Sequence, residues 1–218
     1  MELTDKIDYA TCEKVYALAM DYGEKSANAS AIKKLKKKKN CITIKRVNTP
    51  EKVPVMYIYL FNNKSKLTWF SFVELKGDEG TSFLCGMAQN RGYVIIKSHL
   101  ISRFMERHGW SGDRESCEEY ILMRSFLLWY DVDKVTNEIN AYFDGGMFLG
   151  HLEGRIKILS TYIDESIMYK NQKIKAKWQE LKLRDSKRVA DLKYNPTTKF
   201  IIDCFDEIDM GTRKTVER

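Results

Sequence analysis

The side chains best suited to chemistry in this sequence lie between positions 99 and 107. If residues 98–108 form a helix, at about 100° per residue, one sector of about a quarter-turn carries His99, Arg103, Glu106 and Arg107. The opposite side carries Leu100, Ile101, Phe104 and Met105. One face is therefore expected to pack, and the other to present an imidazole, a carboxylate and two guanidinium groups.

This combination matches the needs of phosphodiester cleavage without a metal ion. An imidazole can move a proton near neutral pH, and guanidinium groups can hold a phosphate and its developing charge. RNA supplies its own nucleophile, the 2′-hydroxyl. His99 would lie in the first helical turn, where the helix N-terminus favours an anion. In an alternative interpretation, Glu106 and the arginines form surface ion pairs and His99 bonds to a backbone group.

Strands and turns are expected to position this helix. Ser98 is the expected N-cap and Gly109 the expected stop. The stretches rich in β-branched and aromatic residues are 42–46, 55–61, 67–75, 82–85 and 93–97. Turn-like residues at 62–65 and 77–80 separate neighbouring stretches, which predicts an antiparallel meander leading into the His99 helix.

The chain after this helix is expected to be helical and then to return to strands. Helices are predicted over 113–130, capped by Asp113, and over 134–143. A hairpin over 147–152 and 155–163, around a Glu153-Gly154 turn, can add to the sheet.

Helices are also predicted at both ends of the chain. One covers 4–21, with Thr4 or Asp5 as its cap, and another covers 26–39; a long helix covers 165–193. The expected class is α+β, with an antiparallel sheet of about five to seven strands. The expected organisation is a helical N-terminal extension (1–40), an α+β core (41–163), and a long basic helix with a tail (164–218), together forming one structural unit.

Positive charge is concentrated in two segments. Residues 25–46 contain nine lysines or arginines and no acidic residue, and residues 165–194 contain nine against four acidic residues. Such segments are typical of polyanion binders, although a solvated helix surface gives the same pattern. The candidate nucleic-acid-binding residues are Lys33, Lys34, Lys36, Lys37, Lys38, Lys39, Lys173, Lys175 and Lys177.

Other candidate sites are weaker. His151, near Glu153, could be a second imidazole, but strand histidines usually face solvent, and His108 lies about 180° from His99 around the helix. Glu74-Leu-Lys76 matches part of a metal-dependent nuclease signature, a pattern that exposed strand faces produce routinely. Aromatic residues on the predicted strands could stack bases, yet a covered sheet needs them as core; they include Tyr57, Tyr59, Phe61, Trp69, Phe70 and Phe72.

Several function classes lack their sequence signatures. The sequence has no P-loop, no dinucleotide-binding glycine motif and no G-x-S-x-G nucleophile motif. Its five cysteines have neither C-x-x-C nor zinc-finger spacing, which indicates reduced thiols and a cytoplasmic protein. No cofactor, metal ion or membrane association is expected.

The strand followed by a short His-x-x-x-Arg helix, with a later antiparallel hairpin, resembles the small bacterial ribonuclease toxins of the barnase and RelE type. It also resembles short toxin-like domains with a His, then Arg-x-x-x-Arg signature. The resemblance spans residues 50–163 and implies metal-independent RNA cleavage, with roles for His99, Arg103 and Arg107. Those families are shorter and have neither the lysine-rich N-terminal helix nor the long C-terminal helix.

The sequence therefore favours a nucleic-acid-directed protein, first a metal-independent ribonuclease of toxin or effector type with His99 as general acid/base. The alternative is a non-catalytic module that binds nucleic acid or a protein. The expected partner is RNA or another polyanion, with a protein inhibitor or partner left open.

Overall fold

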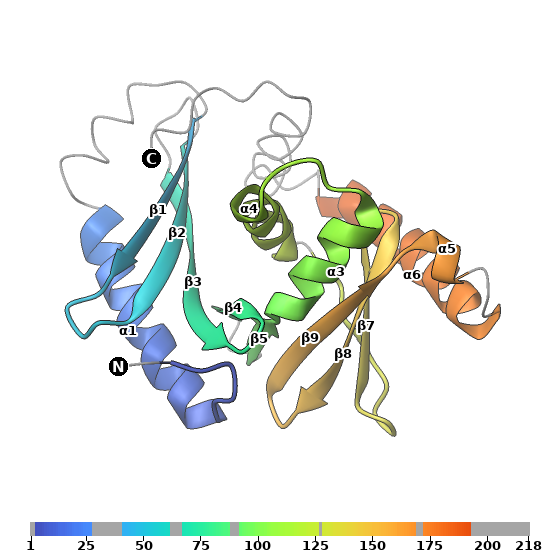
Figure 1. Ribbon diagram of the computed structural model, residues 1–218, viewed down its shortest axis with the longest axis horizontal. Helices are drawn as coiled ribbons and strands as arrows, with labels where there is room; N and C mark the ends of the chain where they lie inside the picture. Colours follow the sequence, from blue (N-terminus) through green and yellow to red (C-terminus); the bar gives the residue numbers. More distant parts are fainter. Residues whose placement is uncertain are drawn as a thin grey trace. The chain divides into compact units, whose positions relative to one another are not determined.

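The structure is a computed structural model that describes residues 3–27, 41–61, 67–87, 92–126, 128–168 and 172–192. Over these ranges the chain forms five helices and nine strands, which confirms the predicted α+β class (Figure 1). The sheet has nine strands where about five to seven were expected, and it is mixed rather than wholly antiparallel, because the strands at 93–96 and 156–163 pair in parallel. In hydrogen-bonded order the strands are β1-β2-β3-β4-β5-β9-β8-β7-β6.

The chain divides into two compact units. One comprises Met1–Leu75 with Leu192–Arg218, and the other comprises Lys76–Asp191. The division falls within strand β3 (Leu67–Gly77). The expected boundaries after residues 40 and 163 stay a prediction.

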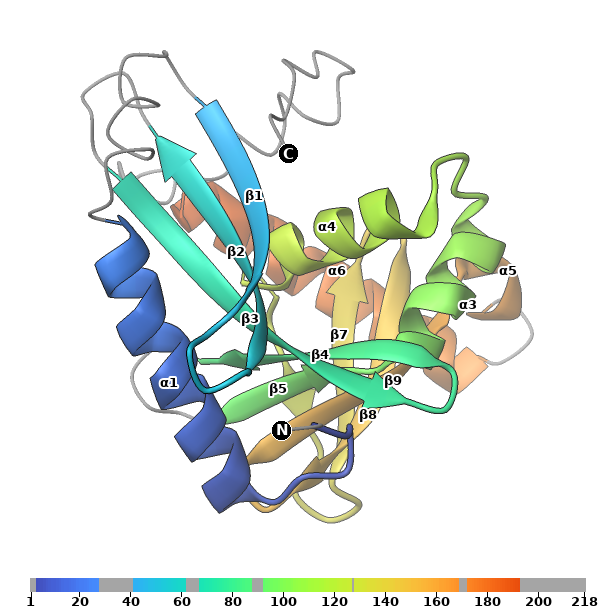
Figure 2. The same cartoon turned by 60° about the vertical axis from the view of Figure 1, so that its left-hand side comes forward.

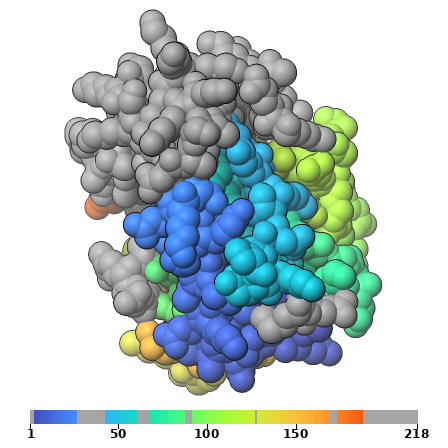
Figure 3. Space-filling model, turned by 90° about the vertical axis from the view of Figure 1, so that its left-hand side faces the viewer, coloured from blue at the N-terminus to red at the C-terminus, as the bar shows by residue number. Residues whose placement is uncertain are grey.

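The first unit contains the first three strands of the predicted antiparallel meander, and the other two, at 80–86 and 93–96, belong to the second unit. β1 (Cys41–Asn48) pairs with β2 (Pro54–Phe61), and β2 pairs with β3. Helix α1 (Tyr9–Ala27) lies beside these strands in Figure 2, and Figure 3 shows its outer surface in dark blue. The Tyr57 hydroxyl donates a hydrogen bond to the Ala19 carbonyl (2.5 Å). Tyr57, Tyr59 and Phe72 are fully buried, which confirms the core interpretation for these three aromatics.

Helix α1 begins and ends later than expected. The Asp8 carboxylate accepts a hydrogen bond from the Thr11 amide (2.7 Å), so the cap is Asp8, and the expected caps at Thr4 or Asp5 were wrong. The helix continues through Gly23 to Ala27. Its buried stripe comprises Cys12, Val15 and Ala19. Of the helix predicted over 26–39, residues 28–39 lie outside the described residues.

Gly23 lies inside α1 because aromatic rings leave no room for a side chain. A Cβ atom at this position would lie 2.6 Å from Trp69 Cζ3 and 2.7 Å from Tyr57 Cε1. The Tyr57 ring is buried and hydrogen-bonded, so it cannot move away without losing contacts. At this position glycine permits close packing and does not end the helix.

Replacing Gly23 with alanine therefore has two effects of opposite sign on the free energy of unfolding. Intrinsic helix propensity alone would stabilise the variant by about 0.8–1 kcal/mol. We expect the steric conflict to outweigh this gain and to lower the free energy of unfolding by about 1 kcal/mol or more, measured by urea denaturation. Glu13→Ala, on the exposed side of α1, is the control and should change it by less than about 0.5 kcal/mol. A stabilised Gly23→Ala protein would contradict the packing described.

The second unit contains the remaining sheet and four helices. Its strands are β4 (Gly80–Gly86), β5 (Tyr93–Ile96), β6 (Asp131–Val132), β7 (Glu138–Phe143), β8 (Gly146–Glu153) and β9 (Ile156–Ile163). Its helices are α3 (Ser98–His108), α4 (Arg114–Ser125), α5 (Glu165–Met168) and α6 (Gln172–Leu192). β5 and β9 are parallel, whereas the pairs β4–β5, β6–β7, β7–β8 and β8–β9 are antiparallel. The predicted β8–β9 hairpin is confirmed, with Gly154 in the left-handed region (φ 59°).

The predicted helix over 134–143 was wrong, because residues 138–143 form strand β7. Its burial alternates with period two: Ile139, Ala141 and Phe143 are buried, whereas the residues between them are not. Before it, the Asp133 carboxylate accepts hydrogen bonds from the amides of Val135 (2.8 Å) and Thr136 (3.1 Å). These bonds hold the pKa of Asp133 below its ordinary value and fix the β6–β7 turn.

Helix α4 also differs from its expected range. The Asp113 carboxylate caps α4 through the Ser116 amide (2.8 Å), as predicted, but the helix ends at Ser125 rather than 130. Residues 131–132 instead pair with β7. The described residues hold no helix long and apolar enough to cross a membrane.

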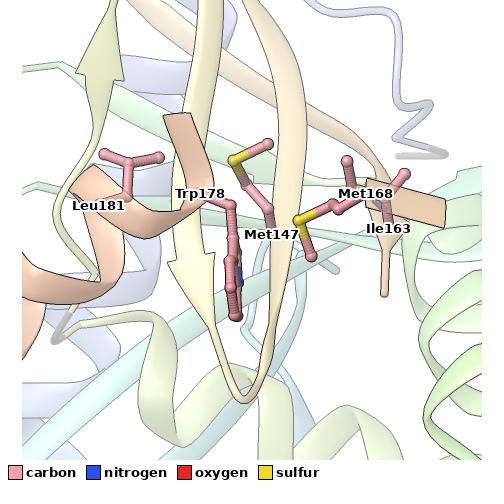
Figure 4. Packing of buried hydrophobic residues seen from close by; sticks show 5 residues of the cluster. All are labelled: Met147, Ile163, Met168, Trp178 and Leu181. Carbon is pink, nitrogen blue, oxygen red and sulfur yellow. The ribbon is translucent and has the colours of Figure 1, made fainter. Parts of the chain in front are cut away.

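Alternating side chains of the β8–β9 hairpin pack on both faces of the sheet. Phe148 and Tyr162 form a cross-strand pair, and the Tyr162 ring lies edge-on to Phe104 of α3 (5.0 Å between centroids). The neighbouring pair, Met147 and Ile163, faces the other way. Figure 4 shows these two residues in a cluster with helix residues from α5 and α6, namely Met168, Trp178 and Leu181. Helix α6 is therefore attached to the hairpin through Trp178 and Leu181.

Three cysteines are buried and are not in disulfides: Cys12, Cys85 and Cys117. Burial raises the pKa of each of these thiols to about 12. A thiolate is the reactive form, so native protein should leave these three thiols unreacted at pH 8.

We expect a thiol reagent such as dithionitrobenzoate to modify these three cysteines at pH 8 only after the protein is unfolded in denaturant. Peptide mass spectrometry of the labelled protein identifies which positions react. Fast modification of Cys12, Cys85 or Cys117 in native protein would contradict their burial.

Candidate active site

Helix α3 is held by its apolar side and presents its polar side outward. Leu100, Ile101 and Phe104 are fully buried. The helix ends as predicted, with Gly109 in the left-handed conformation (φ 67°). The N-cap is Lys97 rather than Ser98, and its side chain makes no capping hydrogen bond. Ser98 is instead a buried first-turn residue with tertiary partners.

His99 lies between two partners of opposite charge. Its Nδ1 atom lies 3.0 Å from Glu79 Oε2, and its Nε2 atom accepts a hydrogen bond from Arg103 Nε (3.3 Å). The His99 side chain is 40% exposed, so solvent and solutes can reach the imidazole. Both ring nitrogens therefore have a partner on the surface of the second unit.

The predicted polar face of α3 continues from His99 as a chain of alternating charges. Arg103 Nη1 donates to Glu106 Oε2 (2.7 Å), and the Arg103 side chain is 38% exposed. The Arg107 guanidinium donates to the Tyr162 carbonyl at the end of β9. Three of the four predicted residues are thus connected to one another, whereas Arg107 bonds to the sheet. At about 1.5 Å per residue, Arg107 lies about 12 Å along the helix from His99.

Glu79 is held in place by its backbone. It lies in the turn between β3 and β4, and its carbonyl accepts a hydrogen bond from Ser98 Oγ (2.7 Å). The Ser98 amide in turn donates to Ser82 Oγ (3.0 Å). The next residue, Gly80, has φ 120°, and a Cβ there would lie 2.8 Å from Ser98 Oγ. The turn can approach the start of α3 this closely only because residue 80 is glycine.

The guanidinium group of Arg114 connects α4 to the first turns of α3. It donates to Ser98 Oγ (2.6 Å), to the Ser98 carbonyl (3.3 Å) and to Ser102 Oγ (2.9 Å). Its Nε atom donates to Glu118 (3.1 Å), whose side chain is only 6% exposed. Ser98 Oγ therefore accepts from Arg114 and donates to Glu79, so one hydroxyl links α4 to the turn that carries the His99 partner.

His108 belongs to a different cluster, as its position on the helix predicted. Its Nε2 atom lies 3.3 Å from Asp144 Oδ2, and its ring stacks on Phe104 (4.6 Å). The Tyr120 hydroxyl donates to the same Asp144 oxygen (2.5 Å). Burial raises the pKa of the Tyr120 phenol, and the hydrogen bond to Asp144 raises it further. This cluster fastens the last turn of α3 to α4 and to the β7–β8 turn.

The remaining candidates that the structure describes are not among the partners of His99. His151 pairs with Glu153 (2.9 Å) at an exposed position on β8. Lys177 bonds to Asp131 (2.5 Å), a contact that raises its pKa and fastens α6 to β6. Lys173 is exposed on α6, and Lys175 is partly buried there. The other lysine candidates, Lys33, Lys34 and Lys36–Lys39, lie outside the described residues.

The weak nuclease match at Glu74 gives no metal site in the part of the chain that the structure describes. Glu74 Oε1 lies 3.3 Å from Arg46 Nη1 within the first unit. No group of three or more His, Cys, Asp or Glu residues among the described positions is arranged to hold a metal ion.

Three residues that support the His99 face were not predicted from the sequence: Glu79, Arg114 and Glu118. Glu79 is 20 positions from His99 and has no fixed spacing from it. Its position near His99 follows from the pairing of β4 with β5. In the β4–β5 pairing Phe83 lies opposite Ile96, so the turn before β4 is brought next to the start of α3.

The Arg114–Glu118 pair should contribute measurably to the stability of the second unit. We expect Glu118→Ala to lower the free energy of unfolding by about 1–3 kcal/mol, because it removes a buried acceptor of a charged hydrogen bond. In a double-mutant cycle with Arg114→Ala, a coupling energy of at least about 1 kcal/mol is expected from urea denaturation of the four proteins. Additivity within about 0.5 kcal/mol would show that the pair does not support the fold.

No protein-family model, no curated protein and no solved structure matches this chain.

Proposed function

We propose that this protein cleaves RNA without a metal ion, using His99 as the general acid/base. The observation that carries the proposal is the arrangement around His99. A carboxylate, Glu79, lies at one ring nitrogen, and a guanidinium, Arg103, lies at the other. The imidazole is partly exposed, so a phosphodiester can approach it. The proposed setting is the cytoplasm, where RNA is present and thiols stay reduced.

The proposed reaction is an internal transesterification. His99 Nε2 takes the proton of the ribose 2′-hydroxyl while the 2′-oxygen attacks phosphorus. The bond from phosphorus to the 5′-oxygen breaks, which leaves a 2′,3′-cyclic phosphate, and the departing oxygen takes a proton from water. Arg103 stabilises the negative charge that develops on the phosphoryl oxygens. Glu106 holds the Arg103 guanidinium near this position through its 2.7 Å contact.

The other basic residues are proposed to bind the rest of the RNA. Arg107 lies too far along α3 for the phosphate at His99, and it is assigned to a neighbouring phosphate of the same strand. Lysines are point charges without base preference, so the lysine run at 33–39 and the exposed Lys173 on α6 would supply affinity that does not depend on sequence.

A second candidate function is binding of RNA or another polyanion without catalysis. The observation that favours it is the contact of Arg103 with His99 Nε2, because this contact occupies the lone pair that a general base uses. The two functions share their charged residues and differ in whether RNA is cut.

The central prediction concerns His99 and Arg103. Purified protein should cleave RNA in the presence of a chelator, and His99→Ala should slow cleavage roughly 10²- to 10⁴-fold, because proton transfer is lost. RNA affinity of that variant should stay nearly unchanged. Arg103→Ala should lose both rate and affinity, because the guanidinium also holds the phosphate in the ground state. Single-turnover kinetics and fluorescence anisotropy measure the two quantities.

The matched control is His151→Ala, which removes an imidazole that also pairs with a glutamate on the surface. It should cleave RNA at the wild-type rate. The melting temperatures of all variants should agree within a few degrees, since exposed ion pairs contribute little to stability. Binding of RNA without any cleavage would favour the second candidate function, and full activity of His99→Ala would remove the catalytic assignment.

A further inference from the structure

Two contacts of His99 specify which of its ring nitrogens carries the hydrogen. An arginine side chain is always charged and can only donate, so Nε2, which faces Arg103 Nε at 3.3 Å, must be the unprotonated nitrogen. An ionised carboxylate can only accept, so Nδ1, which lies 3.0 Å from Glu79, must carry the proton. The two contacts agree on the same neutral tautomer. Protonation of Nε2 would place two N–H groups against each other and would break the contact with Arg103.

The Glu79 carboxylate belongs to a turn that hydrogen bonds hold against the start of α3. Its backbone carbonyl is bonded to Ser98 Oγ at 2.7 Å, and Arg114 donates to the same hydroxyl at 2.6 Å. Arg114 is in turn bonded to the buried Glu118. The carboxylate therefore reaches His99 from a fixed backbone position, although its side chain is 64% exposed.

Arg103, by contrast, makes only a weak contact with His99. Its contact with Nε2 is long for a hydrogen bond and involves a neutral acceptor. A phosphodiester offers two non-bridging oxygens that share one negative charge, in the fork geometry that a guanidinium prefers. Arg103 is also 38% exposed, so its Nε atom can turn from His99 toward a phosphate while Nη1 keeps its contact with Glu106 (2.7 Å).

We infer that Glu79 is the positioning residue for His99 and that Arg103 covers the Nε2 atom until a phosphodiester draws it away. This inference rests on the proposed function for its catalytic meaning. Arrival of the substrate then does two things in one step: it gives Arg103 a better partner, and it exposes the Nε2 lone pair to the 2′-hydroxyl. The site is covered in the absence of RNA and becomes competent when the phosphate is in place.

Nitrogen NMR of the histidine rings in the full-length protein tests the inference without any turnover. In the free protein, His99 Nδ1 should carry the proton and Nε2 should be unprotonated. A DNA oligonucleotide has phosphodiesters but no 2′-hydroxyl, so it should bind without being cut. Its addition should shift the Nε2 resonance of His99 and leave that of His151 unchanged. Arg103→Gln protein should lack this shift.

Glu79→Gln and Glu79→Asp complete the test. Glu79→Gln should populate both tautomers of His99, and Glu79→Asp should restore the single tautomer in part. If RNA is cleaved, Glu79→Gln should lower kcat about 10- to 100-fold, in line with other residues that orient a functional histidine, while KM changes little. Glu153→Gln, which removes the partner of His151, is the control and should leave His99 and the cleavage rate unchanged.

The outcomes separate this inference from the proposed function. An Nε2-protonated His99 in the free protein, or a single tautomer that persists in Glu79→Gln, would overturn the positioning role even if the wild-type protein cleaves RNA. An Nε2 resonance that does not respond to bound DNA would overturn the covering role of Arg103. If RNA is not cleaved but the tautomer and the shift are as described, the proposed function fails and the local arrangement stands.

Discussion

The site depends on one guanidinium group, that of Arg114. This group joins α4 to two serines in the first turns of α3, and through Ser98 it reaches the turn that carries Glu79. Its partner Glu118 is almost fully buried, and a buried carboxylate without a cation would cost several kcal/mol. Docking of α4 and placement of the Glu79 turn are therefore coupled, because both use the same planar donor.

The aromatic side of α3 complements this polar connection. Phe104 contacts the rings of Tyr162 and Phe143 edge-on, and the His108 ring stacks on it. Aromatic pairs of this kind contribute about 0.5–1.5 kcal/mol each beyond the burial of their area. The helix is thus fixed in rotation about its axis, so His99 and Arg103 must face outward. An exposed polar face on a rigidly packed helix is the arrangement that a preorganised site requires.

Periodicity predicted much of this fold, and the misses have identifiable causes. The strands of the meander and the β8–β9 hairpin follow from alternation and turn residues. The helix predicted over 134–143 was wrong because Ile139, Ala141 and Phe143 alternate over only six residues, a length at which helix and strand patterns are hard to separate. The polar face of α3 was predictable from helical spacing, but Glu79 was not, since its approach depends on strand register.

The ends of the RNA products test the central claim most directly. The substrate is a DNA strand with a single ribonucleotide, incubated with the full-length protein and a chelator, and mass spectrometry identifies the products. The account predicts one cut, directly 3′ of the ribonucleotide, with a 2′,3′-cyclic phosphate on one fragment and a 5′-hydroxyl on the other. Cuts at deoxyribonucleotides, or fragments with a 5′-phosphate, would contradict it, because attack by the 2′-hydroxyl can produce neither.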